Sequence, residues 1–135
     1  MSVQLNHLII PARDKWESAR FLARILDAEP GPEWSIFVPV RVSNGVTLDY
    51  ADATDFHTQH YAFLVSDAEF DSALARIRNA GIPFFADFTH RGRGEINHLY
   101  GGRGVYFDDP SGHLLELITR PYGPVPEHWT PDKAG

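Results

Sequence analysis

The sequence predicts an α+β fold made of two βαβββ modules. Strand-like alternation followed by a capped amphipathic helix and further short strands fills the first half of the 135-residue chain, and the same order restarts at residue 59. His7 and His60 take matching places in the two first strands, and Asp14 and Asp67 take matching places at the helix starts, both at an offset of 53 residues. Because each half has too little apolar surface to fold alone, we expect the two modules to pair.

We expect the first module to contain, in order, a strand over residues 4–10, a helix over 14–28, strands over 35–42 and 46–51, and a polar connection over 52–57. Pro11 ends the first strand. Asp14 is a good N-cap, and Glu17 completes an approximate capping box. The Asn44-Gly45 pair between two alternating apolar segments is a strong hairpin signal.

We expect the second module to contain a strand over residues 59–65, a helix over 66–80, a strand over 83–88, a loop over 89–104, strands over 105–108 and 113–119, and an irregular segment from 121. Ser66 and Glu69 form a capping box, and Gly81 stops the helix. The Asp-Pro-Ser-Gly segment at residues 109–112 predicts a tight turn between the last two strands.

Composition fits one globular domain, with 43% hydrophobic and 22% charged residues. We expect a single domain over residues 1–122, with modules at about 4–56 and 57–120, and a Pro-rich tail over 123–135. The net charge of -6 argues against nucleic-acid binding. No apolar run approaches the roughly 20 residues of a membrane span, and no leader pattern opens the chain, so we expect a cytoplasmic protein.

The absence of cysteine excludes disulfides and thiolate metal sites. Histidines and carboxylates remain as ligands. His7 lies on its strand face between apolar residues, as does Glu116, and His60 shares its face with apolar residues too. Two neutral imidazoles and one carboxylate suit Fe(II), Mn(II) or another divalent ion, with positions left open for substrate. The alternative is that each is a core residue satisfied by hydrogen bonds, because strand periodicity alone does not bring the three together.

Three motifs carry a family resemblance. They are Asn6-His7-Leu8, the sequence QHYAF at residues 59–63, and GHLLE at residues 112–116. With them, residues 4–120 resemble the vicinal oxygen chelate superfamily, which includes glyoxalase I, fosfomycin-resistance thiol transferases, bleomycin-resistance proteins and extradiol dioxygenases. The resemblance implies a half-barrel around one metal ion, with His7, His60 and Glu116 as its ligands.

Residues 96–116 also resemble the extradiol dioxygenase signature. This implies that Tyr106 and His98 hydrogen-bond oxygen intermediates or transfer protons. The alternatives are a core tyrosine and a solvated loop histidine. The chain has one module pair where the larger extradiol enzymes have two. It also resembles small ChaP-like enzymes, which act on aromatic polyketides in antibiotic biosynthesis.

Two further side chains have open interpretations. Residues 46–49 resemble the glyoxalase I strand that ends in a metal-binding Glu, but Asp49 is one methylene shorter, and we favour a solvated strand residue. His113 alternates to the face opposite Glu116, and we expect it in a turn or at the surface.

The resemblance implies a metal-dependent extradiol-type oxygenase. Its partners would be O2 and a catechol or hydroxyquinone-like aromatic, and its metal would be Fe(II), with Mn(II), Ni(II) and Zn(II) as alternatives. The rival functions are a glyoxalase I-like isomerase, a fosfomycin-type thiol transferase, and an antibiotic-binding resistance protein without catalysis. We expect a homodimer, and neither a nucleic-acid nor a membrane partner.

Overall fold

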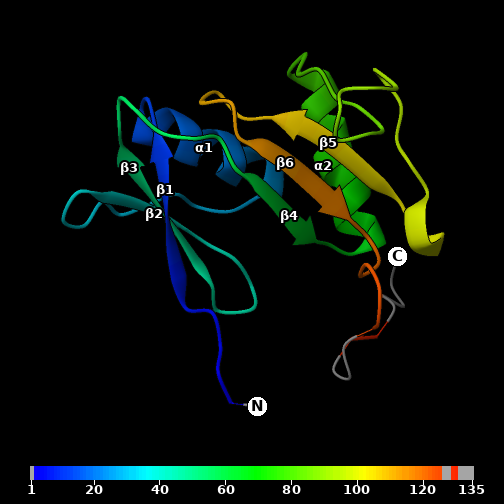
Figure 1. Ribbon diagram of the computed structural model, residues 1–135, viewed down its shortest axis with the longest axis horizontal. Helices are drawn as coiled ribbons and strands as arrows, with labels where there is room; N and C mark the ends of the chain where they lie inside the picture. The colour runs from blue at the N-terminus through cyan, green and yellow to red at the C-terminus, as the bar shows by residue number, and fades with distance from the viewer. Residues whose placement is uncertain (1, 126–128, 131–135) are drawn as a thin grey trace. The chain divides into compact units, whose positions relative to one another are not determined.

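The computed structural model describes residues 2–125 and 129–130 and contains two compact units. Unit 1 comprises Met1–His57 with Asp109–Ser111, and unit 2 comprises Thr58–Asp108 with Gly112–Gly135. Each unit has one three-stranded sheet and one α-helix in its described part (Figure 1). The predicted fold class, two small modules of strands and a helix, is confirmed.

Unit 1 contains β1 (His7–Ala12), α1 (Lys15–Leu26), β2 (Phe37–Arg41) and β3 (Thr47–Asp52). The strand order is β1-β3-β2, with β1 parallel and β2 antiparallel to β3. The expectation that Pro11 ends the first strand is wrong, because Pro11 lies inside β1 and pairs with Ala51. A proline is tolerated there because β1 is an outer strand of this sheet, so one of its sides needs no backbone N–H.

The predicted start of the first helix is confirmed, since the Asp14 side chain accepts a hydrogen bond from the Glu17 N–H at 3.1 Å. The buried side chains of α1 face the sheet, and they include Ala19, Leu22, Ala23 and Ile25. Ser18 of α1 lies 3.1 Å from Ser111, Oγ to Oγ, and the Arg13 N–H donates to Ser111 Oγ at 3.0 Å. These bonds attach the turn at residues 109–111 to unit 1.

Unit 2 contains β4 (His60–Leu64), α2 (Asp67–Asn79), the short 3₁₀ helix η1 (Leu99–Gly101), β5 (Gly104–Asp108) and β6 (Leu114–Ile118). The strand order is β4-β6-β5, with β4 parallel and β5 antiparallel to β6, and α2 lies along one face of the sheet (Figure 1). The capping box of Ser66 and Glu69 is confirmed, and Gly81 follows the helix at φ 68.

The predicted strand over residues 83–88 is wrong. Phe85 alone pairs with Tyr106, through N–H···O bonds of 2.8 and 2.9 Å in the two directions. Pro83 has no N–H to offer, and the N–H groups of Ala86 and Asp87 turn to the Arg91 carbonyl at 3.1 and 3.2 Å instead. A local turn therefore replaces a fourth strand beside β5.

The apolar core of unit 2 is formed by alternate residues of β5 and β6 with the inner side of α2. Its most buried members include Phe70, Ile77, Val105, Phe107, Leu115 and Leu117. His113 is also fully buried, which corrects the expectation of a turn or surface residue. Its Nδ1 accepts from the Gln59 N–H at 3.0 Å, and the Tyr61 ring packs edge-on at 5.6 Å. His113 thus binds the backbone just before β4, a long-range contact that strand alternation does not predict.

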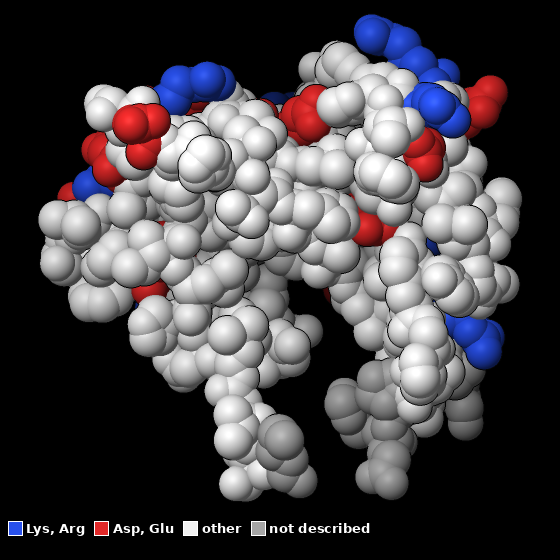
Figure 2. Space-filling model, viewed as in Figure 1, with Lys and Arg blue, Asp and Glu red and all other residues white. Residues whose placement is uncertain are grey.

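The charged side chains form no large patch of one sign on the face shown in Figure 2, where acidic and basic residues lie scattered. No helix in the described part of the chain is long and apolar enough to cross a membrane.

Candidate active site

The buried carboxylate of Glu116 is the centre of the candidate site. Glu116 lies in the middle of β6, the central strand of unit 2, and is 1% exposed. Its neighbours in register are Ala62 on β4 and Tyr106 on β5. Because paired residues point to the same side of a sheet, these side chains share the face opposite the apolar core.

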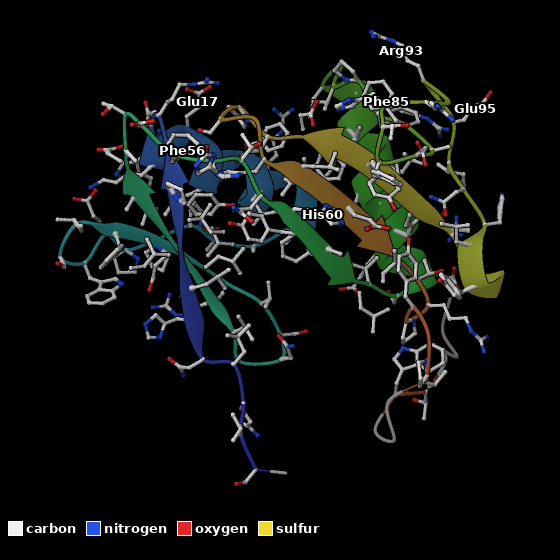
Figure 3. All side chains as sticks on the ribbon, in the orientation of Figure 1. Glu17, Phe56, His60, Phe85, Arg93 and Glu95 are labelled. Atoms are coloured by element: carbon white, nitrogen blue, oxygen red, sulfur yellow. The ribbon has the colours of Figure 1, made fainter. Side chains whose placement is uncertain are left out.

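His60 lies at the first position of β4, where Figure 3 labels it, and its imidazole contacts Glu116. Its Nε2 lies 3.0 Å from Glu116 Oε1, and its Nδ1 lies 3.0 Å from the Leu114 carbonyl oxygen. A carbonyl can only accept, so Nδ1 carries a proton and Nε2 faces the carboxylate. In the neutral ring a nitrogen lone pair and a carboxylate oxygen then converge, which is the arrangement of two ligands of one cation. In the protonated ring the same pair is a salt bridge.

Two tyrosine hydroxyls complete this face of the sheet. Tyr106 is 5% exposed, and its ring stacks on the His60 imidazole with centroids 5.9 Å apart. Burial raises the pKa of Tyr106, and the negative charge of Glu116 adds to the rise. Burial and the hydrogen bond to Glu116 likewise raise the pKa of Tyr122, whose hydroxyl donates to Glu116 Oε2. Both hydroxyls therefore keep their protons at neutral pH and act as donors.

Sequence reasoning missed Tyr122. The residue lies beyond the end of β6, in a segment without regular structure, where no periodicity predicts the direction of a side chain. Its ring contacts that of Tyr100 in η1, with centroids 4.6 Å apart. The one available signal was an aromatic residue six positions after a carboxylate that needs a partner.

Unit 1 carries a similar pair of residue types. His7 is exposed on β1, and its Nδ1 lies 2.7 Å from Asn6 Oδ1. Asp49 lies on β3 opposite Ile9, two residues along from His7, so the imidazole and the carboxylate share a sheet face. Asp49 is 3% exposed, and its buried Oδ1 has no hydrogen-bond partner among the described residues. The expectation of a solvated Asp49 is wrong, because Asp49 lies on the central strand of its sheet.

The two units place these residues in the same register. His7 pairs with Thr47 and Ile9 with Asp49, while His60 pairs with Leu114 and Ala62 with Glu116. Asp49 thus occupies in unit 1 the place of Glu116 in unit 2.

The donors of both pairs fit a divalent metal ion. Imidazole nitrogen and carboxylate oxygen are common ligands for such ions, and a buried oxygen without a partner, as in Asp49, is stabilised by a cation. Among the described residues no three His, Asp or Glu side chains gather as a metal site, and the printed contact between two of them at these positions is that of His60 with Glu116 in unit 2.

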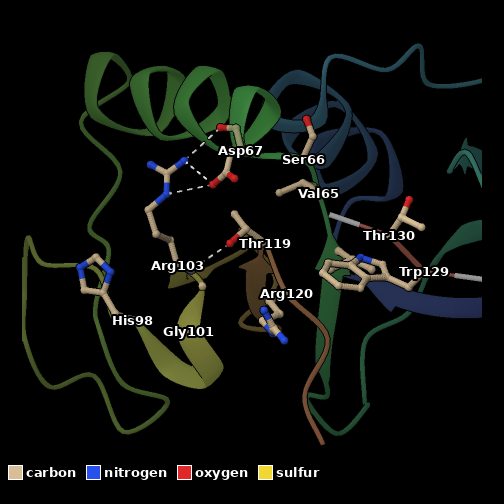
Figure 4. A pocket seen from close by; sticks show the side chains of 12 residues that line it. Val65, Ser66, Asp67, His98, Gly101, Arg103, Thr119, Arg120, Trp129 and Thr130 are labelled. Atoms are coloured by element: carbon tan, nitrogen blue, oxygen red, sulfur yellow. Dashed lines mark hydrogen bonds and ion pairs between the residues drawn. The ribbon is translucent and has the colours of Figure 1, made fainter. Parts of the chain in front are cut away.

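His98 lies apart from these contacts. It is exposed, precedes η1, and lines a cavity of about 550 Å³ in unit 2 together with Arg103, Arg120 and Trp129 (Figure 4). Arg103 is held there by Asp67 at 2.9 Å and by a second aspartate on α2. In the described part of the chain His98 makes no hydrogen bond to Glu116 or Tyr106, so its assigned role stays a prediction.

Comparison with known proteins gives the family. Residues 4–117 match the model of the Glyoxalase/Bleomycin resistance protein/Dioxygenase superfamily. The solved structure of Oxidase ChaP-H2 is 57% identical, with a TM-score of 0.88 over 91% of this chain and 98% of that chain. Oxidase ChaP-H1 is 52% identical, with a TM-score of 0.87 over 91% of this chain and 100% of that chain.

More distant relatives include a glutathione transferase and an antibiotic-resistance protein. Glutathione transferase FosA of Serratia marcescens is 27% identical over 124 residues, which cover 87% of this chain and 81% of FosA. The fosfomycin resistance protein FosX of Mesorhizobium loti is 22% identical, with a TM-score of 0.67 over 90% of this chain and 96% of that chain, and shows a shared fold. The chain belongs to the Glyoxalase/Bleomycin resistance protein/Dioxygenase superfamily, as its motifs predicted.

Proposed function

We propose that this protein is a metal-dependent oxygenase of the extradiol type that acts on a catechol or hydroxyquinone-like aromatic compound. The observation that carries the proposal is the buried Glu116 carboxylate, 3.0 Å from His60 Nε2, with the protonated Tyr106 stacked on the imidazole. Similarity to two oxidases at 57% and 52% identity supports an oxidising enzyme. The ChaP-like resemblance points to an aromatic polyketide as the substrate class.

We assign His7, His60 and Glu116 as the metal ligands, with Fe(II) as the ion and His7 coming from the same chain or from a second copy. A bound ion would supply a Lewis acid and redox centre for a substrate with two adjacent oxygens and for O2. Extradiol cleavage places both atoms of O2 in the product, so it needs no external reductant.

The protein's own residues prepare this chemistry. The Leu114 carbonyl fixes the His60 ring through Nδ1, which leaves Nε2 directed at the carboxylate. The pKa of Tyr106 is raised by burial, so its hydroxyl keeps a proton that it can donate to an oxygen that gains negative charge. The low exposure of Glu116 and Tyr106 reduces competition from water for these contacts.

An oxygen electrode tests the proposal. The protein is loaded anaerobically with Fe(II) and mixed with O2 and a panel of catechols and hydroxyquinones. We expect O2 uptake that depends on both iron and substrate and that disappears in His60→Ala and Glu116→Ala. Arg93→Ala, a change in an exposed loop residue, is the control and should keep full uptake.

A glutathione transferase or isomerase activity is the second candidate, supported by the similarity to FosA at 27% identity. It would use the same ligands, and Asp49 as a fourth ligand would favour it. Iron-loaded protein that consumes no O2 with any panel member, but conjugates glutathione or isomerises a hemithioacetal, would contradict the oxygenase proposal. Binding of an aromatic antibiotic without any bound metal would favour the non-catalytic alternative.

A further inference from the structure

The two oxygens of the Glu116 carboxylate have different partners, both within unit 2. Oε1 lies 3.0 Å from His60 Nε2, and Oε2 accepts a hydrogen bond from the Tyr122 hydroxyl. Glu116 is 1% exposed, so its carboxylate depends on protein groups for stabilisation. A phenol that donates to a carboxylate makes a charge-assisted hydrogen bond, which is stronger than a neutral one.

A second aromatic ring, that of Tyr100, packs against the Tyr122 ring. The two ring centroids lie 4.6 Å apart, with an interplanar angle of 35°. Tyr100 lies in η1 with a φ of 56, in a tight turn of the backbone. The hydroxyl of Tyr100 makes no hydrogen bond among the described residues, whereas that of Tyr122 is directed at Glu116.

We propose that Tyr122 is a positioning residue that holds Glu116 Oε2, so that Glu116 binds a divalent cation through Oε1 alone, beside His60 Nε2. The inference rests on the metal site of the proposed function and adds to it a residue outside the ligand set. The Tyr100–Tyr122 ring pair holds the donating hydroxyl in place, and this couples the segment after β6 to the geometry of the ligand.

Two consequences follow for metal binding. Loss of a hydrogen-bonded group behind a metal ligand typically costs about 10–100-fold in metal affinity, because the ligand must then be ordered by the metal itself. A carboxylate released from Tyr122 can also turn and coordinate through both oxygens. That change would occupy one more coordination position on the ion.

The matched variants Tyr122→Phe and Tyr100→Phe test the inference, since each keeps its ring and removes one hydroxyl. The dissociation constant for Mn(II) is measured by titration calorimetry on metal-free protein. We expect about 10–100-fold weaker binding for Tyr122→Phe and unchanged binding for Tyr100→Phe. Thermal unfolding of the metal-free proteins checks that both variants fold.

The visible absorption of the Co(II)-loaded proteins provides a readout that a general loss of stability would not move. Its bands weaken as coordination number rises, so we expect weaker bands for Tyr122→Phe than for wild type, with Tyr100→Phe like wild type. Equal or tighter Mn(II) binding by Tyr122→Phe with an unchanged Co(II) spectrum would overturn the role of Tyr122 and leave the proposed function standing. Wild-type protein that binds neither ion, and so behaves like Glu116→Gln, would overturn both.

Discussion

Replacing Asp49 should make the metal-free protein more stable. Asp49 lies on the central strand of unit 1, is 3% exposed, and has a buried Oδ1 without a hydrogen-bond partner in the described part of the chain. Asp49→Leu keeps the branched shape and removes both polar atoms. Asp49→Asn keeps the polar shape and removes the negative charge.

The size of the effect follows from that unpartnered oxygen. A buried acceptor without a partner costs about 1–3 kcal/mol, so Asp49→Leu should raise the free energy of unfolding by about that amount. Unfolding entropy near 2.1 cal/mol/K per residue gives about 0.3 kcal/mol/K for a chain of 135 residues. The midpoint of thermal unfolding should therefore rise by about 3–10 °C. Asp49→Asn should gain less, because the amide still lacks a partner.

Thermal unfolding is measured first with a chelator and then with Mn(II), which gives the stability of the metal-free and the metal-loaded protein. Without metal the variants should melt above wild type. With Mn(II) the wild type should gain more than either variant if Asp49 contributes an oxygen to the ion, because a ligand stabilises the state that binds it. Asp52→Asn is the matched control on the same strand. Asp52 already accepts a hydrogen bond from the Lys15 N–H at 2.8 Å, so removal of its negative charge should not raise the melting temperature. A metal-free Asp49→Leu protein less stable than wild type would refute the reasoning.

Four further predictions concern the site. His7→Ala, His60→Ala and Glu116→Ala should each lose the bound divalent ion by elemental analysis, and full occupancy in Glu116→Ala would end the ligand assignment. Tyr106→Phe should keep the metal and slow turnover by about 10²–10⁴-fold, whereas an unchanged rate would make Tyr106 a core residue. The pKa of Tyr106 is raised in the folded state, so above about pH 10 the folded protein keeps a proton that the unfolded chain loses. The free energy of unfolding should therefore fall as the pH rises above about 10, and it should fall less steeply in Tyr106→Phe. Inactive His7→Ala chains can be mixed with inactive Glu116→Ala chains. If a homodimer builds each site from both chains, the mixture should regain part of the activity. No recovery at any mixing ratio would show that each site is built within one chain.

Local signals predicted the elements well wherever short-range chemistry decides the structure. The caps at Asp14 and Ser66, the hairpin at Asn44-Gly45 and the stop at Gly81 are all confirmed. Strand alternation also assigned Glu116 to one face of its strand, and the structure pairs it there with Tyr106, which alternation had not been used to place.

The failures concern burial and partners that arise from other parts of the chain. Asp49 and His113 looked like surface residues because their neighbours in sequence include polar or turn residues. Their burial depends on the strands and loops that cover them. Tyr122 reaches Glu116 from an irregular segment, where no periodic pattern fixes a side-chain direction. Pairing partners and loop contacts are long-range properties, and the local patterns of a single sequence carry little signal for them.

The two units share a strand register, so their carboxylates take equivalent positions, but the surroundings of the two carboxylates differ. Glu116 and Asp49 both lie on a central strand, two residues along from a histidine on the neighbouring parallel strand. Glu116 is held by an imidazole and by the Tyr122 phenol, so its orientation is fixed in advance. Asp49 is shorter, and its buried Oδ1 has no hydrogen-bond partner in the part of the chain that the structure describes, which is a destabilising feature. On the proposed metal site, the shared register would therefore offer the cation one carboxylate that is already oriented, Glu116, and a second, Asp49, whose burial a nearby cation would make less costly.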